Sequence, residues 1–182
     1  SLERVDGRIK ASGGAKYGDD LAFPGMLYAC AVRSPKPRIA IRSVSDSKAR
    51  SVPGYVTLVT HKDVKGVNKW PVVLNDYPFF PEKEARFAGE TVALAVGETY
   101  AAAKKASKMV GIGYRELPYL DDPLKSMEKK SVKIYGKDNV ISSFVIKKGD
   151  ARKALKGCKY VIEKEFRTNY QVHAYLETQT AT

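Results

Sequence analysis

The segment that most constrains the fold is a strand, a helix and a second strand in close succession near the middle of the chain. Residues 91–96 have the continuous apolar character of a buried strand. Residues 99–110 place small and apolar side chains on one helical face and three lysines on the opposite face, with Thr99 suited to cap the start. Residues 112–117 form a second strand pattern, ended by a proline. This order predicts a right-handed βαβ unit.

The rest of the chain shows shorter patterns of the same two kinds. Runs of apolar and β-branched residues bounded by proline or glycine predict further strands at residues 25–33, 39–44, 55–60, 140–146 and 160–166. Two further short helices are expected, at residues 45–52 and at 151–156, the latter capped by Asp150. The chain is thus expected to mix helices and strands.

The remaining segments read as connections. Residues 1–24 are polar and glycine-rich, which is typical of an extended lead-in. Residues 61–89 carry prolines and few periodic apolar positions, so they are expected to be rich in loops. Residues 118–139 have little periodicity and make the best candidate for a domain boundary.

Charge and cysteine content narrow the functional classes. The 182 residues contain 32 Lys and Arg against 20 Asp and Glu, a net charge of +12. Residues 125–167 alone hold thirteen basic and five acidic side chains, and such an excess of positive charge could serve nucleic acid, an acidic membrane, an anionic partner or only solubility. Cys30 and Cys158 stand far apart with no paired-cysteine motif, which argues against a disulfide scaffold, a zinc site or a cysteine-held cluster and favours a reducing, cytoplasmic setting.

No catalytic motif is complete. Gly111-Ile112-Gly113 follows a helix and opens a strand, the reverse of a dinucleotide-binding turn. The adjacent pairs Asp19-Asp20 and Asp121-Asp122 lie in turn-like contexts, whereas catalytic carboxylates converge from separate elements. Two histidines are too few for a histidine-rich metal site. We therefore expect no catalytic, cofactor-binding or metal-binding residues in this chain.

A polar row near the end of the chain stands out. Gln171, His173 and Glu177 lie in an otherwise core-like segment, and with Tyr175 they would share one face of a strand. Such a row can be a hydrogen-bonded network that supports a site, or a plain solvated face. The residues alone leave both readings open.

Many short motifs follow one another in a family's order. They are Asp6-Gly7, Ala15-Lys16-Tyr17, Pro24-Gly25-Met26-Leu27-Tyr28-Ala29, Arg33-Ser34-Pro35, Pro53-Gly54, Arg86-Phe87-Ala88-Gly89-Glu90, Tyr114-Arg115-Glu116-Leu117-Pro118, Asp122-Pro123, Gly149-Asp150, Phe166-Arg167-Thr168 and residues 171–177. In this order the chain resembles the N-terminal part of the molybdenum-binding large subunit of the xanthine dehydrogenase/aldehyde oxidase family. It departs from the family's pattern at Lys36, Arg38 and Ala85.

The resemblance implies an α+β fold and a domain organisation. Residues 1–15 would be the lead-in, residues 16–125 an α/β hammerhead domain, and residues 126–182 a connector and the beginning of the first molybdopterin-binding domain. Complete members hydroxylate purines, aldehydes or N-heterocycles with oxygen taken from water. They hold molybdenum through molybdopterin and pass electrons to iron–sulfur and flavin subunits or domains.

The family's cofactor loop and catalytic glutamate have no counterpart in this chain, so the resemblance implies a structural part that holds no cofactor and is inactive alone. Its partners would be the remainder of the molybdenum-binding subunit and the iron–sulfur and flavin parts. No membrane partner is expected, and a homo-oligomer is a possible assembly. Arg86 and Phe87 would be packing or interface residues, and Gln171, His173 and Glu177 supports near the cofactor domain. The alternative is a basic nucleic-acid-binding module, which the charge favours but which lacks aromatic residues interleaved with the lysines.

Overall fold

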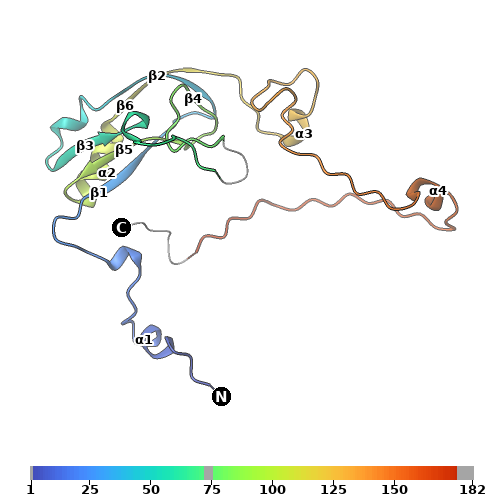
Figure 1. Cartoon of the computed structure of the whole chain (residues 1–182), viewed down its shortest axis with the longest axis horizontal. Coiled ribbons are helices and arrows are strands. Elements are labelled where there is room, and N and C mark those ends of the chain that lie inside the picture. Colours follow the sequence, from blue (N-terminus) through green and yellow to red (C-terminus); the bar gives the residue numbers. More distant parts are fainter. Residues whose placement is uncertain (1, 72–75, 176–182) are drawn as a thin grey trace. The chain divides into compact units, whose positions relative to one another are not determined.

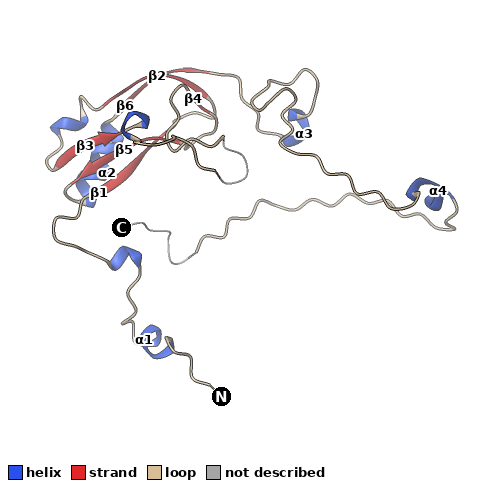
Figure 2. Ribbon diagram, viewed as in Figure 1, coloured by secondary structure: helices blue, strands red, loops and turns tan. Residues whose placement is uncertain are grey.

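The computed structural model describes residues 2–71 and 76–175. The chain divides into one unit of residues 25–143 and a second that comprises residues 1–24 and 144–182. Figure 1 traces the chain by colour, and Figure 2 shows that the labelled strands all belong to the first unit. Among the described residues, none of the helices has the length and apolar character needed to cross a lipid bilayer.

The first unit alternates strands with short helices. Its elements, with η marking a single 3-10 turn, are β1 (Tyr28–Arg33), β2 (Ile39–Ser45), η2 (Ala49–Ser51), β3 (Tyr55–Val59), η3 (His61–Asp63), β4 (Glu84–Ala85), β5 (Thr91–Gly97), α2 (Tyr100–Met109), β6 (Gly111–Glu116) and α3 (Pro123–Ser126). The expected helix at residues 45–52 is reduced to the turn η2.

Strand β5 is the centre of one three-stranded sheet. It lies between β1 and β3 and is antiparallel to both, with Ala31 and Val59 each opposite Leu94. Side chains of a strand alternate between its faces. Ala93 and Ala95 accordingly belong to a buried cluster with Ala106 of helix α2, while Val92 belongs to a second buried cluster.

Helix α2 packs closely on this sheet because its inward face is made of alanine. Ala102, Ala103 and Ala106 are buried, and the lysine face is exposed, as the helical periodicity predicts. The Thr99 hydroxyl accepts a hydrogen bond from the Ala102 amide at 3.1 Å, which confirms the expected cap. Gly97 completes the fit, since a Cβ there would lie 2.7 Å from the Ala103 nitrogen.

A second sheet has the order β4-β2-β6, with both pairs antiparallel. Its core residues Ile39 and Ala85 are fully buried and pack with Val92 of β5. This arrangement corrects the predicted βαβ unit: β5 and β6 join different sheets. The reason is that both hydrogen-bonding edges of β5 are taken by β1 and β3, so β6 pairs with the free edge of β2 instead.

Arg38, one of the departures from the family's pattern, joins three parts of this sheet. Its Nε donates to Glu84 Oε1 at 2.7 Å, and its Nη1 donates to the Pro118 carbonyl at 2.9 Å. The Arg38 side chain is 12% exposed and that of Glu84 32%, so the ion pair is partly shielded from water. Lys36 forms a second pair with Glu116 at 2.9 Å. The two ion pairs thus connect the residues just before β2 to the neighbouring strands β4 and β6.

The second unit contains three short elements among its described residues: α1 (Gly7–Ala11), η1 (Gly18–Asp20) and α4 (Ala151–Lys156). Helix α1 lies within the segment expected to be extended. Helix α4 is as predicted, and the Asp150 carboxylate accepts from the Lys153 amide at 3.0 Å.

The predicted strands at residues 140–146 and 160–166 are absent from the structure, although both segments are described. A β-strand is stabilised by hydrogen bonds to a neighbouring strand. No strand among the described residues pairs with either segment. Every described residue from 140 to 175 is exposed.

Candidate functional site

The site begins where two of the sequence motifs meet at the ends of β1 and β5. The Ser34 amide donates to the Glu90 carbonyl at 2.8 Å, and the Gly89 amide donates to the Ser34 carbonyl at 2.9 Å. The Arg33 guanidinium donates to the Gly89 carbonyl, also at 2.9 Å. Gly89 has a φ of 84°, a conformation that side chains disfavour. The Arg-Ser-Pro and Arg-Phe-Ala-Gly-Glu motifs therefore form one joint.

Glu90 is the buried acid of this joint. The residue is 4% exposed, and one carboxylate oxygen accepts from the Arg86 amide at 2.6 Å. Burial raises the pKa of the Glu90 carboxyl, while hydrogen bonding to the Arg86 backbone and the positive charge of Arg86 act in the opposite direction. No ion pair among the described residues involves Glu90.

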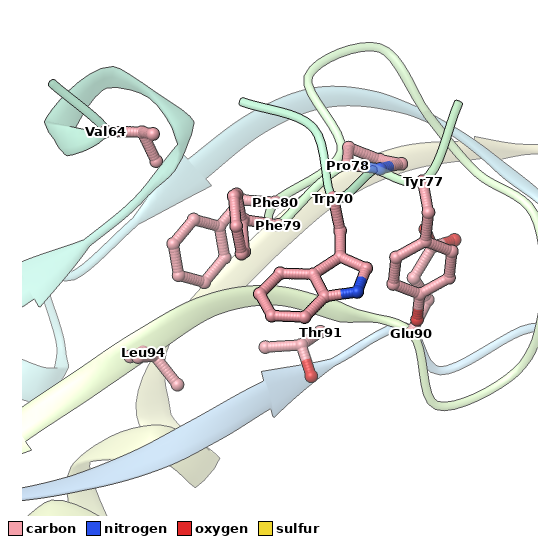
Figure 3. Close-up of a pocket in the computed structure, with 9 residues that line it drawn as sticks. All are labelled: Val64, Trp70, Tyr77, Pro78, Phe79, Phe80, Glu90, Thr91 and Leu94. Carbon is pink, nitrogen blue, oxygen red and sulfur yellow. The ribbon is translucent and has the colours of Figure 1, made fainter. Parts of the chain in front are cut away.

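Glu90 also lines an aromatic pocket of about 880 Å³. The other lining residues come from the loop before β4 and from β5; they are Val64, Trp70, Tyr77, Pro78, Phe79, Phe80, Thr91 and Leu94. Figure 3 shows the indole of Trp70 between the phenylalanine rings on one side and Tyr77 on the other, with Glu90 beside Tyr77. Leu94 lies on the face of β5 that helix α2 does not cover.

Hydrogen bonds connect described residues of the loop that carries Trp70, Tyr77, Phe79 and Phe80 (the aromatic loop). The Asn68 side chain donates to the Phe80 carbonyl at 2.7 Å and accepts from the Phe80 amide at 3.1 Å. The Trp70 amide donates to the Tyr77 carbonyl at 2.6 Å. The Trp70 and Phe79 rings meet edge to face, with centroids 5.6 Å apart and planes at 87°. The loop thus presents its rings as an organised group.

The described residues among those singled out in the sequence belong to both units of the chain. Phe87 lies at the edge of the pocket, where its ring stacks on Tyr77 at 6.4 Å, and Arg86 contributes its backbone amide to Glu90. Gln171 and His173 are exposed in the second unit, outside any strand, and the His173 ring lies 5.7 Å from that of Tyr175. Glu177 lies outside the described residues.

The aromatic pocket itself was missed by the sequence reasoning, which treated residues 61–89 as loop. A signal was present, because the aromatic residues Trp70, Tyr77, Phe79, Phe80 and Phe87 crowd into this short stretch. In the part of the chain that the structure describes, no group of three or more His, Cys, Asp and Glu residues is placed to hold a metal ion.

Comparison with known proteins identifies the two segments. Residues 12–118 match the family model described as "Aldehyde oxidase and xanthine dehydrogenase, a/b hammerhead domain". Residues 134–182 match the model of a molybdopterin cofactor-binding domain.

Individual proteins similar to this chain agree with the two family-model matches. A probable xanthine dehydrogenase subunit of Bacillus subtilis is 34% identical over 98% of this chain, which spans 24% of that protein. The nicotinate dehydrogenase large molybdopterin subunit of Eubacterium barkeri is 29% identical over 96% of this chain, which spans 41% of it. The solved aldehyde oxidoreductase from Desulfovibrio gigas has a TM-score of 0.78 at 25% identity, over 86% of this chain and 19% of that one.

The relatives named here include no nucleic-acid-binding protein, so the alternative gains no support from them. The expected order, a hammerhead domain followed by the start of a molybdopterin-binding domain, is confirmed. The chain belongs to the aldehyde oxidase and xanthine dehydrogenase family of molybdenum hydroxylases and represents an N-terminal region of their large subunit.

Proposed function

We propose that this chain is the structural N-terminal part of the molybdenum-binding subunit of a xanthine-dehydrogenase-like hydroxylase. In this proposal residues 16–125 form the hammerhead domain and residues 126–182 form a connector and the beginning of the first molybdopterin-binding domain. The relatives in which such a segment occurs are much longer than this chain. The assembled protein would hydroxylate a purine, an aldehyde or an N-heterocycle in the cytoplasm.

The observation that carries the proposal is apolar surface in the segment that matches the cofactor-binding domain. Phe144, Ile146 and Phe166 are 91%, 97% and 85% exposed, and Tyr170 is 95% exposed. Side chains of this size gain about 1.5–3 kcal/mol each when they leave water. The alternating pattern of residues 160–166 is that of a half-buried strand. Both features support a segment that completes its fold against further protein.

The described residues do not themselves fit molybdopterin. A pterin site needs an enclosed cradle of backbone and polar groups. In the described part of the segment that matches the cofactor-binding domain, residues 140–175 are all exposed and helix α4 has only six residues. The cofactor would supply oxygen transfer and electron acceptance in the complete protein, and we assign no catalytic step to a residue of this chain.

The chain's own contribution is to position neighbouring protein. Arg86 and Phe87 lie beside the joint of β1 and β5, on a surface that also carries the exposed rings of Trp70 and Tyr77. This supports a packing or interface role for both residues. Gln171, His173 and Glu177 are proposed as hydrogen-bonding supports once their segment is folded. Iron–sulfur and flavin parts would be the electron-accepting partners.

The test is the composition of the protein in its native cell. An affinity tag inserted in the exposed lead-in retrieves the chain together with whatever it is joined to or bound by. We expect about one molybdenum per copy, with iron and flavin present, and hydroxylase activity on a panel of purines, aldehydes and N-heterocycles. Purification without molybdenum, iron or flavin would overturn the proposal. The 182-residue chain produced alone serves as the control, and it should bind no molybdenum.

A further inference from the structure

Glu90 is a buried acid and one of the residues that line an apolar cavity. A carboxylate taken out of water without a cationic partner is unfavourable, and hydrogen bonds from backbone amides offset only part of that cost. Glu90 is 4% exposed, accepts from the Arg86 amide and forms no ion pair with any described residue. The positive charge of Arg86 also acts on Glu90 without forming an ion pair, and the other described residues that line the pocket are mostly aromatic or aliphatic. The pocket can therefore offer a cation a carboxylate that no described residue pairs with directly.

The walls have the chemistry that suits a cation on an apolar stem. Aromatic faces attract a cation within about 6 Å of the ring, and tryptophan does so most strongly. Trp70, Tyr77 and Phe79 line the pocket and are 52%, 51% and 43% exposed. Among the described residues of the lining, Glu90 is the sole ionisable acid or base apart from the Tyr77 phenol. An anionic guest finds no cationic side chain among the described residues of this lining.

We propose that the pocket receives one arginine or lysine side chain from the part of the large subunit outside residues 1–182, with the cationic group on Glu90 and the stem between Trp70 and Tyr77. The inference rests on the proposed function, in which further protein of the same subunit covers this unit. The relatives' length supports a covering polypeptide, since the chain spans 24% and 41% of two of them. An arginine or lysine is proposed as the occupant because its positive charge is complementary to the Glu90 carboxylate.

The experiment uses the 182-residue chain and a pair of probes of nearly equal shape. Phenethylguanidinium carries the cation of arginine on an apolar stem, and phenethylurea is its neutral counterpart. Trp70 is the single tryptophan, so its fluorescence reports on the pocket directly. The titration is carried out at about pH 8, well above the ordinary pKa of a glutamate carboxyl. We expect the cation to bind at least about tenfold more tightly than the urea, in keeping with charge-assisted pairing.

Matched variants identify the carboxylate. Glu90→Gln keeps an oxygen that can accept from the Arg86 amide and removes only the charge, so the preference for the cation should disappear. Glu82→Gln makes the same charge change at an exposed residue outside the pocket and should preserve the preference. Circular dichroism confirms that each variant is folded. Equal binding of the two probes to the unmodified chain, or an unchanged preference in Glu90→Gln, would overturn the proposal.

A second measurement tests the occupant. An aryl-diazirine derivative of phenethylguanidinium should label peptides from residues 64–94 in the isolated chain but not in the assembly purified from native cells, where the pocket is already filled. Equal labelling of both would overturn the assignment to the subunit's own side chain. If the proposed function were wrong, the result would differ from this one: the assembly purified from native cells would lack molybdenum. The probe preference of the isolated chain does not depend on that outcome.

Discussion

Gly97 is the position where the closeness of helix and sheet can be tested by one added methyl group. It ends strand β5, and it pairs with Tyr28 on one side and with Tyr55 on the other. A Cβ at this position would lie 2.7 Å from the Ala103 nitrogen, 3.1 Å from the Ala102 Cβ and 3.1 Å from the Gly54 carbonyl oxygen. Two of these three neighbours are backbone atoms. They cannot move away by a side-chain rotation.

The expected loss of unfolding free energy follows from how far β5 and α2 must move apart to accept the new methyl group. Relief of the 2.7 Å contact requires a shift of about 0.7 Å between β5 and the start of α2. Overpacking of this kind typically costs about 1–3 kcal/mol. The Gly→Ala change recovers about 0.4–1 kcal/mol, because alanine lowers the entropy of the unfolded chain. We therefore expect Gly97→Ala to lose about 1–2 kcal/mol of unfolding free energy, which corresponds to roughly 3–8 °C in Tm.

Thermal and urea unfolding of the 182-residue chain measure this loss. Gly111→Ala is the control, since its nearest atom to the new Cβ is the Ser45 carbonyl oxygen at 3.9 Å, and it should be neutral or slightly stabilising. Ala102→Gly should not rescue Gly97→Ala, because the closest contact is with the Ala103 nitrogen rather than with the Ala102 side chain. A Gly97→Ala chain as stable as the unmodified one would refute the packing argument.

Three further changes test the local interactions. Thr99→Ala should lose about 1 kcal/mol of unfolding free energy, because the Ala102 amide loses its acceptor, and Thr99→Ser should retain most of it. Arg38→Met should lose about 1–3 kcal/mol, because the partly buried Glu84 carboxylate loses its cationic partner. Burial and the hydrogen bond to Asp46 raise the pKa of Tyr55 to about 12 in the folded chain, against about 10 in the unfolded one. The stability that this shift provides is complete below pH 10 and is lost between pH 10 and about 12, a loss that Tyr55→Phe should remove.

Urea unfolding of control variants tests whether the Thr99 hydroxyl, the Arg38–Glu84 pair and the Tyr55 phenol cause these effects. A Thr99→Ser chain as weak as Thr99→Ala would rule out the hydroxyl as the stabilising group. Arg38→Met and Glu84→Gln should be strongly non-additive in a double-mutant cycle, and simple additivity would contradict direct pairing. For the tyrosine, Tyr119→Phe is the control at an exposed phenol. Parallel pH profiles of the Tyr55→Phe chain and the unmodified chain would contradict the assigned shift.

Elements whose signal is local were predictable from the sequence. Helix α2 has its alanine face, its lysine face and its cap within twelve consecutive residues, and strand β5 has an uninterrupted apolar run. The pairing of β6 was not predictable in this way. It depends on the edges of β5 being occupied by β1 and β3, which lie far away in the sequence. Periodicity carries no information about which edge remains free.

The candidate site shows the same division. The resemblance indicates the Arg86–Glu90 motif, with Arg86 and Phe87 as packing or interface residues, and the structure adds the hydrogen bond from the Arg86 amide to the Glu90 carboxylate. The pocket depends on hydrogen bonds between Asn68 and Phe80 across a loop without periodicity. In residues 160–166 the alternation predicts a strand that the described structure does not form. A strand pattern specifies a tendency, and a neighbouring strand is needed to realise it.

We expect residues 25–143 to fold by themselves, whereas the segment that follows folds only with further protein of the subunit. Hydrogen exchange followed by mass spectrometry tests this most directly, because amides exchange slowly only where hydrogen bonds persist. We expect strong protection of β1, β2, β5, β6 and α2 in the isolated 182-residue chain and in the native assembly alike. We expect near-complete exchange of residues 144–175 in the isolated chain and protection of the same residues in the assembly. Protection of residues 144–175 in the isolated chain, or their free exchange in the assembly, would contradict it.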